Sequence, residues 1–334
     1  MNFSEILGHQ RQIEILKRSL EGNRLHHAYL FVGPHGVGKK KVALSLAAAV
    51  HCSRMKGDSC GLCDNCRRVG AGNHPDVRVV EPEPGKREIG IQQIRSLQRM
   101  LALRSFTGKK KVAIIDPAHL MNYHAQNSLL KTLEDPPGDA LLILIDHSTG
   151  GLLATVLSRC LRLYFTFLSV EQVAQILTAK QGTAEEEATL LAAVTGGSLG
   201  EALSGDQEEL ISRRREWIDR YISLAEGDFR GAMKLAEDLG RDREKAVSFA
   251  RWVQEWYRDV LMQQLGLGQG TIKNRDRMQS IDAAVPSLSI AETLTALEGL
   301  ERLARNLQKN YNCRLLVEEF LLGRRVIPPR GNYK

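Results

Sequence analysis

The sequence holds 334 residues, of which 43% are hydrophobic and 25% charged, and this predicts two or three domains that each bury a core. No apolar run approaches the ~18 residues that span a bilayer, and the amino-terminal segment lacks the basic-then-apolar order of a signal peptide. We therefore expect a soluble, cytoplasmic protein with no membrane partner. The net charge of +7 is a mild basic bias that suits a nucleic-acid partner, although proteins without one share it.

The first half of the chain alternates strand-like and helix-like segments. Short apolar runs predict strands at 28–32, 76–82, 111–116 and 140–146. Helical spacing of apolar residues predicts helices at 5–21, 41–52, 89–104 and 124–135. Such alternation predicts a mostly parallel sheet with helices on both faces.

The alternation ends near residues 161–169, and the rest of the chain is helical in pattern. The pattern of apolar residues predicts small helices over 170–203 and helices throughout 206–323. Trp252, Trp256 and Tyr257 recur at a spacing typical of helix packing. We expect an α/β domain over 1–166, a small helical domain over 167–205 and an all-helical domain over 206–334.

The motif GPHGVGKKK follows the 28–32 strand and is almost a phosphate-binding loop. Its spacing G-x-x-x-x-G-K is met by Gly33, Gly38 and Lys39, with Gly36 as a further glycine. Backbone N–H groups of such a loop point at phosphates, and its lysine would reach the β- and γ-phosphates of a nucleotide. The alternative is a glycine-rich turn without function. The flanking strand and helix favour a phosphate loop.

Two positions argue against ATP hydrolysis at this loop. A Ser or Thr hydroxyl normally follows the loop lysine and binds Mg²⁺, but this chain has Lys40 there. The strand VAIID ends at Asp116 and is followed by Pro117, which cannot act as a general base. The loop is thus a candidate for passive binding of ATP or ADP, and hydrolysis is not expected.

Four of the six cysteines follow the spacing C-x7-C-x2-C-x2-C within an insertion over 52–66. They are Cys52, Cys60, Cys63 and Cys66. In a chain without export signals such a cluster favours metal ligands over disulfides. Tetrahedral Zn²⁺ bound by four thiolates is the natural occupant, in a closed and structural site. An iron–sulfur cluster and free thiols are the alternatives. His51 and His74 lie nearby but have no ligand role beside a complete Cys₄ set.

Three further stretches carry a family resemblance together with this cluster. They are LHHAYLFVGPHGVGKKK, NSLLKTLEDPPGDALLILI (Asn127–Ile145) and LLATVLSRCLRL (Leu152–Leu163). With them the chain resembles, over nearly its whole length, the bacterial DNA polymerase III clamp-loader subunits, a branch of the AAA+ ATPases. The resemblance implies an AAA+ P-loop domain with a parallel sheet, a small helical lid domain and an all-helical collar domain for oligomerisation. It also implies that the zinc insertion is structural.

Within this family the chain is more similar to the delta-prime stator than to the gamma/tau motor. The four nucleotide-handling positions that differ from the motor pattern are Lys40, Pro117, Asp146 and Gly200. Asp146 stands where motors carry a polar sensor residue, and Gly200 stands where they carry an arginine. The resemblance therefore implies a subunit with little or no ATPase activity of its own. An active gamma/tau-like ATPase and a zinc-containing DNA-repair protein are the alternatives.

One catalytic element of the family is kept. Arg159, in the sequence LSRC, matches the arginine finger that reaches into a neighbouring subunit's ATP site. A guanidinium there would stabilise charge on the transferring phosphoryl group in trans. The alternative is a solvated or salt-bridged arginine.

The resemblance also implies partners. These are the gamma/tau and delta subunits of a hetero-pentamer, the sliding clamp, and primer–template DNA held by backbone contacts. The candidate DNA segment is Gly85–Arg95, in which Lys86, Arg87 and Arg95 would meet phosphates; a solvated helix end is the alternative. The run Arg213–Arg215 is interpreted as solvated, and His119 and His124 receive no role.

Overall fold

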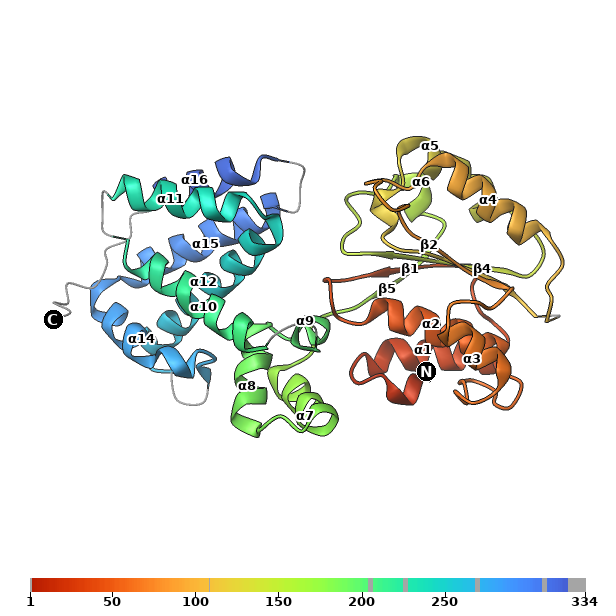
Figure 1. The fold of residues 1–334 in the computed structure, drawn as a ribbon, viewed down its shortest axis with the longest axis horizontal. Coiled ribbons are helices and arrows are strands. Elements are labelled where there is room, and N and C mark those ends of the chain that lie inside the picture. Colours follow the sequence, from red (N-terminus) through yellow and green to blue (C-terminus); the bar gives the residue numbers. More distant parts are fainter. Residues whose placement is uncertain are drawn as a thin grey trace. The chain divides into compact units, whose positions relative to one another are not determined.

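The computed structural model describes residues 2–107, 109–203, 207–224, 228–267, 271–307 and 311–323. The chain divides into two compact units, both visible in Figure 1. The sheet unit comprises residues 1–181 and 197–203, and the helical unit comprises 182–196 and 204–334. The three domain boundaries expected from the sequence stay a prediction, and the end of the chain, 324–334, lies outside the described residues.

The sheet unit is built on five parallel strands in the order β2-β3-β4-β1-β5. They are β1 (Ala28–Val32), β2 (Val77–Val80), β3 (Lys111–Ile115), β4 (Ala140–Asp146) and β5 (Leu161–Tyr164). Every residue of β1, β3 and β4 is buried, as expected of central parallel strands covered on both faces. The predicted α/β parallel-sheet fold is thereby confirmed.

Helices cover both faces of this sheet (Figure 1). One face carries α1 (Gln10–Glu21), α2 (Lys39–His51) and α3 (Asp64–Gly70). The other carries α4 (Ile91–Ala102), α5 (Tyr123–Glu134) and α6 (Ala154–Leu157). Because side chains alternate along a strand, Tyr29 and Phe31 join the core under α1 and α2, whereas Ala28 and Leu30 join the core under α4 and α5.

Four further helical segments belong to the sheet unit. These are η1 (Phe3–Glu5), η2 (Ala118–Leu120), α7 (Val170–Gln181) and α9 (Leu199–Leu203). The segment before α9 lies close to the end of the β5 region, because a Cβ placed on Gly197 would come within 2.1 Å of the Leu168 carbonyl oxygen. This close approach brings α9 to the phosphate loop.

The helical unit is all-helical in its described residues, as predicted. Its longer helices are α8 (Glu185–Val194), α10 (Gln207–Ile222), α11 (Phe229–Gly240), α12 (Arg243–Gln264), α15 (Ile290–Leu307) and α16 (Cys313–Leu322). Shorter pieces are η3 (Arg275–Arg277), α14 (Met278–Ala284) and η4 (Val285–Ser287). Trp252, Trp256 and Tyr257 are all buried in its core, which confirms their interpretation as packing residues.

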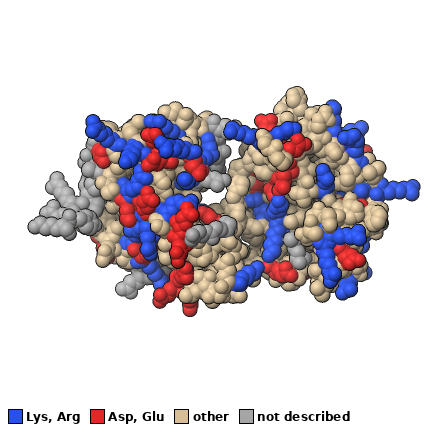
Figure 2. Space-filling model, viewed as in Figure 1, with Lys and Arg blue, Asp and Glu red and all other residues tan. Residues whose placement is uncertain are grey.

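Figure 2 shows the charged side chains on one face of the molecule. On the face drawn in Figure 2, basic and acidic side chains are intermixed over each unit. Among the described residues, no helix is both long enough and apolar enough to cross a membrane.

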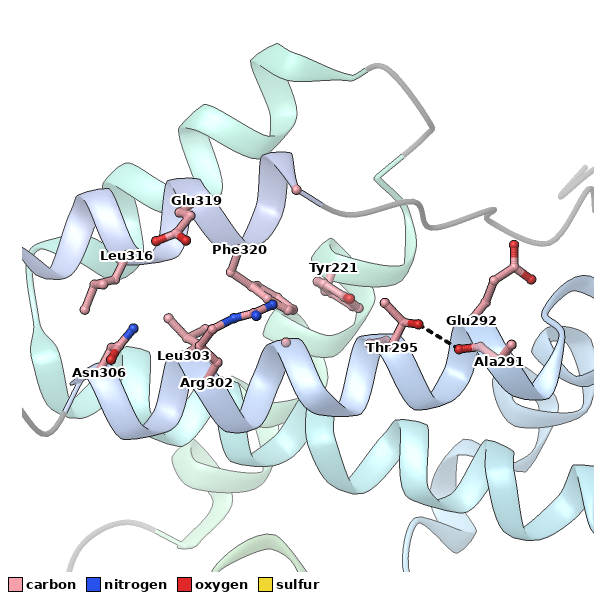
Figure 3. Close-up of a pocket in the computed structure, with 13 residues that line it drawn as sticks. Tyr221, Ala291, Glu292, Thr295, Arg302, Leu303, Asn306, Leu316, Glu319 and Phe320 are labelled. Carbon is pink, nitrogen blue, oxygen red and sulfur yellow. Dashed lines mark hydrogen bonds between the residues drawn. The ribbon is translucent and has the colours of Figure 1, made fainter.

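The helical unit also holds a groove of about 440 Å³ between α15 and α16. Phe320 and Arg302 lie across it in Figure 3, with the Tyr221 ring of α10 at its side. The rings of Tyr221 and Phe320 are nearly parallel, with centroids 6.2 Å apart. The groove is formed entirely by this unit and contains none of the residues that the sequence nominated for chemistry.

The interpretation of Arg213–Arg215 as a solvated run is wrong for its middle residue. Arg214 is 1% exposed and its guanidinium donates to Asp276 Oδ2 at 2.9 Å and to the Asn274 side chain. The Asn274 amide in turn donates to the buried Asp259 carboxylate at 2.6 Å. Arg214 is buried because η3, which lies some sixty residues later in the chain, supplies these partners.

Arg214→Ala is expected to lower the free energy of unfolding of the helical unit by about 3 kcal/mol, because it removes a buried guanidinium that is the nearest partner of the partly buried Asp276 carboxylate and leaves only Arg215 and Arg277 at 3.8 Å. Arg213→Ala is the matched control: its side chain is 35% exposed and forms an i,i+4 ion pair with Glu209, so the cost should be about 1 kcal/mol or less. Chemical unfolding followed by tryptophan fluorescence reports this unit alone, since all three tryptophans belong to it. Equal costs for the two variants would contradict the assignment.

Candidate nucleotide loop and metal centre

The phosphate loop connects β1 to α2. Gly38 is the residue that caps the amino end of α2, and the helix begins at Lys39, two residues earlier than predicted. The Gly33 N–H donates to the carbonyl of Asp146 at the end of β4, at 3.2 Å. The loop thus lies over the carboxyl ends of β1 and β4 and presents a helix amino terminus, which favours negative charge.

Packing as well as phosphate geometry requires glycine in this loop. A Cβ on Gly33 would come within 2.2 Å of the Phe165 carbonyl oxygen. At Gly36, where φ is +72°, a Cβ would come within 2.3 Å of Ser198 Oγ. Both contacts are far shorter than a real Cβ makes, so these positions exclude larger residues.

Helix α9 is hydrogen-bonded to the loop. The Gly200 N–H donates to the Gly36 carbonyl at 2.8 Å. A Cβ on Gly200 would lie 2.9 Å from the same oxygen. In this arrangement the position where family motors carry an arginine has no room for a side chain.

The loop lysine bonds to the loop itself. Lys39 is 6% exposed, and its ammonium donates to the carbonyls of Gly33 at 2.5 Å and Pro34 at 2.6 Å. Burial lowers the pKa of Lys39 to about 8, although the nearby carboxyls of Asp116 and Asp146 oppose the shift. Lys40 makes an ion pair with Glu81. Both lysines are thus engaged by protein groups, and the nucleotide role expected of Lys39 stays a prediction.

A cluster that the sequence analysis missed lies at the end of β4. His119, to which no role was given, donates through Nδ1 to Asp146 Oδ1 at 2.8 Å. The His147 backbone N–H reaches the same oxygen at 2.6 Å, and the His147 ring stacks on His35 with centroids 5.2 Å apart. Burial alone would raise the pKa of Asp146, but the hydrogen bond from His119 and the nearby His147 ring hold it well below its usual range. The residue where motors carry a sensor is therefore a buried carboxylate whose Oδ1 is engaged by protein donors.

The structure brings the four predicted cysteine ligands together. One sulfur from each of Cys52, Cys60, Cys63 and Cys66 lies within 4.8 Å of the others. Backbone N–H groups point at two of these sulfurs: those of Met55 and Cys60 lie 3.3 and 3.4 Å from Cys52 Sγ, and that of Cys63 lies 3.3 Å from Cys60 Sγ. Such N–H···S bonds favour thiolate, and four clustered sulfurs are the donor set that suits Zn²⁺.

Charge repulsion inside this cluster favours a cation. Burial would raise the pKa of Cys63, but hydrogen bonds from the Ser53 backbone and from Cys66 lower it to about 6. Burial and the neighbouring Cys63 raise the pKa of Cys66 to about 12. The opposed shifts indicate that ionising one sulfur disfavours ionising its neighbour, and a metal ion would supply the balancing positive charge.

His51 and His74 lie against each other beside this insertion, with ring centroids 4.2 Å apart. Asp76 completes a possible ligand group with them, yet its carboxylate already accepts hydrogen bonds from Ser105, Phe106 and Thr107. Asp76 therefore has a structural role, because its hydrogen bonds hold the loop that precedes β3.

The candidate finger Arg159 lies just after α6. It pairs with Glu134 of α5 at 2.6 Å and also donates to the Thr155 carbonyl at 2.9 Å. Its side chain is 34% exposed. The observed contacts tie it to α5 and α6, so in this state Arg159 is a partly exposed, salt-bridged arginine.

The candidate DNA segment forms the amino end of α4. Arg87 and Arg95 are exposed there, whereas Lys86 pairs with Glu83 at 2.6 Å. Gln93 holds the helix start by accepting from the Gly90 N–H at 3.1 Å. All three nominated cations are thus exposed on this segment, and Lys86 is already paired with a carboxylate.

Comparisons with known proteins agree with this architecture. The family model described as "DNA polymerase III, delta subunit" matches residues 8–169, and "DNA polymerase III, delta subunit, C terminal" matches 208–324. The chain is 33% identical to "DNA polymerase III subunit delta'" of Bacillus subtilis over 331 residues, which cover 93% of this chain and 94% of the relative. It is 39% identical to the Pseudomonas aeruginosa subunit of that name over 55% of this chain and 57% of the relative.

A relative of another kind is the tau subunit of Escherichia coli, 30% identical over 98% of this chain but only 51% of its own length. The fold and these matches define the class, which is that of the DNA polymerase III subunits with a phosphate-loop sheet and a helical carboxyl-terminal region. Within that class, the near-complete match to the Bacillus subtilis protein decides the family. The chain belongs to the delta-prime family of DNA polymerase III subunits.

Lys39→Met is expected to make folding stability less dependent on pH above neutrality. With a folded pKa of about 8 against 10.5 in the unfolded chain, the unfolded state binds more protons between these values, so the wild type gains stability as pH rises. Between pH 7 and 10 this gain is about 2 kcal/mol relative to the methionine variant. Far-ultraviolet circular dichroism during chemical unfolding measures it.

The control for this experiment is Lys40→Met, which removes an exposed lysine from the next position. It should retain the wild-type pH dependence between pH 7 and 10. If Lys39→Met retained that dependence as well, the lysine would be ordinary and the account of its burial would be wrong.

Proposed function

We propose that this chain is the stator of a DNA polymerase III clamp loader, a subunit that helps load the sliding clamp onto primed DNA in the bacterial cytoplasm. The observation that carries the proposal is the full-length similarity to a subunit named delta'. Its partners would be the gamma/tau and delta subunits, in a hetero-pentamer, together with the clamp and primer–template DNA. DNA would be held through its backbone, for which the exposed Arg87 and Arg95 are candidates.

The same proposal gives the chain little or no ATPase of its own. Pro117 stands where a catalytic carboxylate would follow Asp116, and Lys40 replaces the Mg²⁺ ligand. The contact of Gly200 with the Gly36 carbonyl supports this, because a sensor arginine has no space there. Gly33, Gly36, Gly38 and Lys39 would hold ATP or ADP as a passive ligand once the lysine leaves its loop carbonyls.

Arg159 would act in trans on the ATP site of a neighbouring subunit. In the free chain its guanidinium is held by Glu134 and the Thr155 carbonyl. An exposed ion pair of this kind is worth about 1 kcal/mol or less, so the side chain can exchange Glu134 for a phosphate at small cost. The developing charge on the phosphoryl group would then replace the carboxylate as its partner.

Arg159→Ala in a reconstituted loader with primed DNA and clamp is expected to lower hydrolysis at the site it serves by about 10³-fold, the usual worth of an arginine finger. Arg162→Ala is the matched control, because Arg162 is exposed and lies three residues further along the same stretch. Steady-state ATPase of the two complexes makes the comparison. Wild-type turnover by the Arg159→Ala complex would remove the finger from the proposal.

The isolated chain should show no turnover in the same assay. Robust hydrolysis by the chain alone, abolished by Lys39→Ala, would instead identify an active motor of the gamma/tau type.

We further propose that Cys52, Cys60, Cys63 and Cys66 hold a structural Zn²⁺. Cobalt replacing zinc should show the intense near-ultraviolet absorption of thiolate-to-cobalt charge transfer, and Cys63→Ser should weaken this absorption and lower the stability of the sheet unit. Cys313→Ser is the control, because it removes a buried thiol of α16 that lies outside the cluster. Loss of the absorption band in both variants, or in neither, would contradict the assignment.

A further inference from the structure

A second group of metal-type ligands lies at the carboxyl end of β4. His119, Asp146 and His147 each offer one ligand atom, and these three atoms lie within 4.8 Å of one another. Asp146 ends β4, His147 follows it, and His119 belongs to η2 after β3. The two neighbouring strands of one sheet therefore hold the group in place before any ligand arrives.

Two donor atoms of this group are buried without a hydrogen-bond partner. The Asp146 residue is 1% exposed, and while its Oδ1 accepts from His119 and from the His147 backbone, its Oδ2 accepts from nothing in the described part of the chain. The His147 Nδ1 lies 3.0 Å from Asp146 Oδ1 but outside hydrogen-bond geometry, and it is equally without a partner there. An unsatisfied buried polar atom costs about 1–3 kcal/mol, so a ligand that engages this cluster gains by giving these two atoms a partner.

We propose that His119, Asp146 and His147 bind a divalent transition-metal ion of the Zn²⁺ type, through one imidazole nitrogen of each histidine and the Asp146 carboxylate. Two imidazoles and one carboxylate are a ligand set of borderline softness that suits such ions and leaves a fourth position open for water or a ligand. No clustered thiol takes part, so this site is independent of the cysteine cluster.

The present geometry needs only a small change to hold the ion. Ligand atoms of a tetrahedral zinc site lie about 3.3 Å apart, given metal–ligand distances of about 2.0–2.2 Å. The Nδ1 atoms of His119 and His147 are 2.8 and 3.0 Å from Asp146 Oδ1, so each has to move outward by about half an ångström or less. Both rings are partly exposed, at 24% and 17%, which leaves them room to do so.

The exchange is balanced in protons and charge. A neutral histidine carries one ring proton, and on binding through Nδ1 that proton resides on Nε2. The ion then replaces the His119 N–H as the partner of the carboxylate, and no oxidation or reduction takes place. The nearby Lys39 ammonium is bound to the carbonyls of Gly33 and Pro34, so its hydrogen bonds are not directed at the ion's ligands.

The test uses the full chain with its cysteine cluster first filled with zinc, titrated with Co²⁺ and followed by visible absorption and calorimetry. One further equivalent of cobalt is expected, with weak visible bands of a nitrogen- and oxygen-ligated ion and without thiolate-to-cobalt charge transfer. Removing a residue that only hydrogen-bonds to a metal ligand lowers metal affinity by about 10- to 100-fold. Because His119 and Asp146 would bind the metal directly, His119→Ala and Asp146→Asn should each weaken cobalt binding by about 100-fold or more. His124→Ala, which removes an exposed histidine of α5, should leave it unchanged.

Two results would overturn the proposal: the zinc-filled wild type takes up no further cobalt, or His119→Ala binds the further cobalt as tightly as the wild type does. A thiolate band as the sole new signal would mean that cobalt had only displaced zinc, and it counts as the first of these results. Because Asp146 is buried, the Asp146→Asn result is used only if the circular dichroism of this variant matches that of the wild type. If it does not, His119→Ala, which changes a partly exposed side chain, is the deciding variant. The outcome does not depend on the clamp-loader assignment, since no partner subunit enters the measurement.

Discussion

The complete burial of β4 is the constraint on which the sheet unit depends. All seven residues of Ala140–Asp146 are buried, because β3 and β1 flank the strand and helices cover both faces. A strand with no solvent-facing side can present polar groups to a site only at its end. The Asp146 carboxylate therefore meets the loop and two histidines where water is largely excluded, and protein groups balance its charge.

Most of the sheet could be predicted because this burial leaves a mark in the sequence. A strand covered on both faces needs a nearly continuous apolar run, and the runs at 28–32 and 140–146 coincide with β1 and β4 to the residue. β2 is less apolar, lies at the sheet edge and is shorter than predicted, at Val77–Val80. The four cysteines were equally accessible to sequence reasoning, because they lie within fifteen residues of one another in the chain and their sulfurs lie close together in the structure.

What could not be predicted depends on partners far away in the chain. Arg214 has the same helical surroundings in sequence as Arg213 and Arg215, and only the later η3 segment buries it. His119 likewise meets Asp146 across 27 residues, through the adjacency of two strand ends. The helical period and the composition of a segment do not reveal such contacts. An exposed arginine and a buried one can have the same local sequence pattern, and only the tertiary fold determines which of them is buried.

Packing within the sheet unit is enough to require two glycines of the phosphate loop. Gly33 is required by the Phe165 carbonyl, Gly36 by Ser198, and Gly200 by the Gly36 carbonyl, so each would be kept for packing alone. Lys39 is likewise satisfied by loop carbonyls in the free protein. The glycine pattern is therefore weaker evidence for nucleotide than its resemblance to active loops suggests. Stronger evidence for or against nucleotide binding comes from positions that packing does not constrain. At three such positions this chain has Lys40, Pro117 and the buried Asp146 carboxylate.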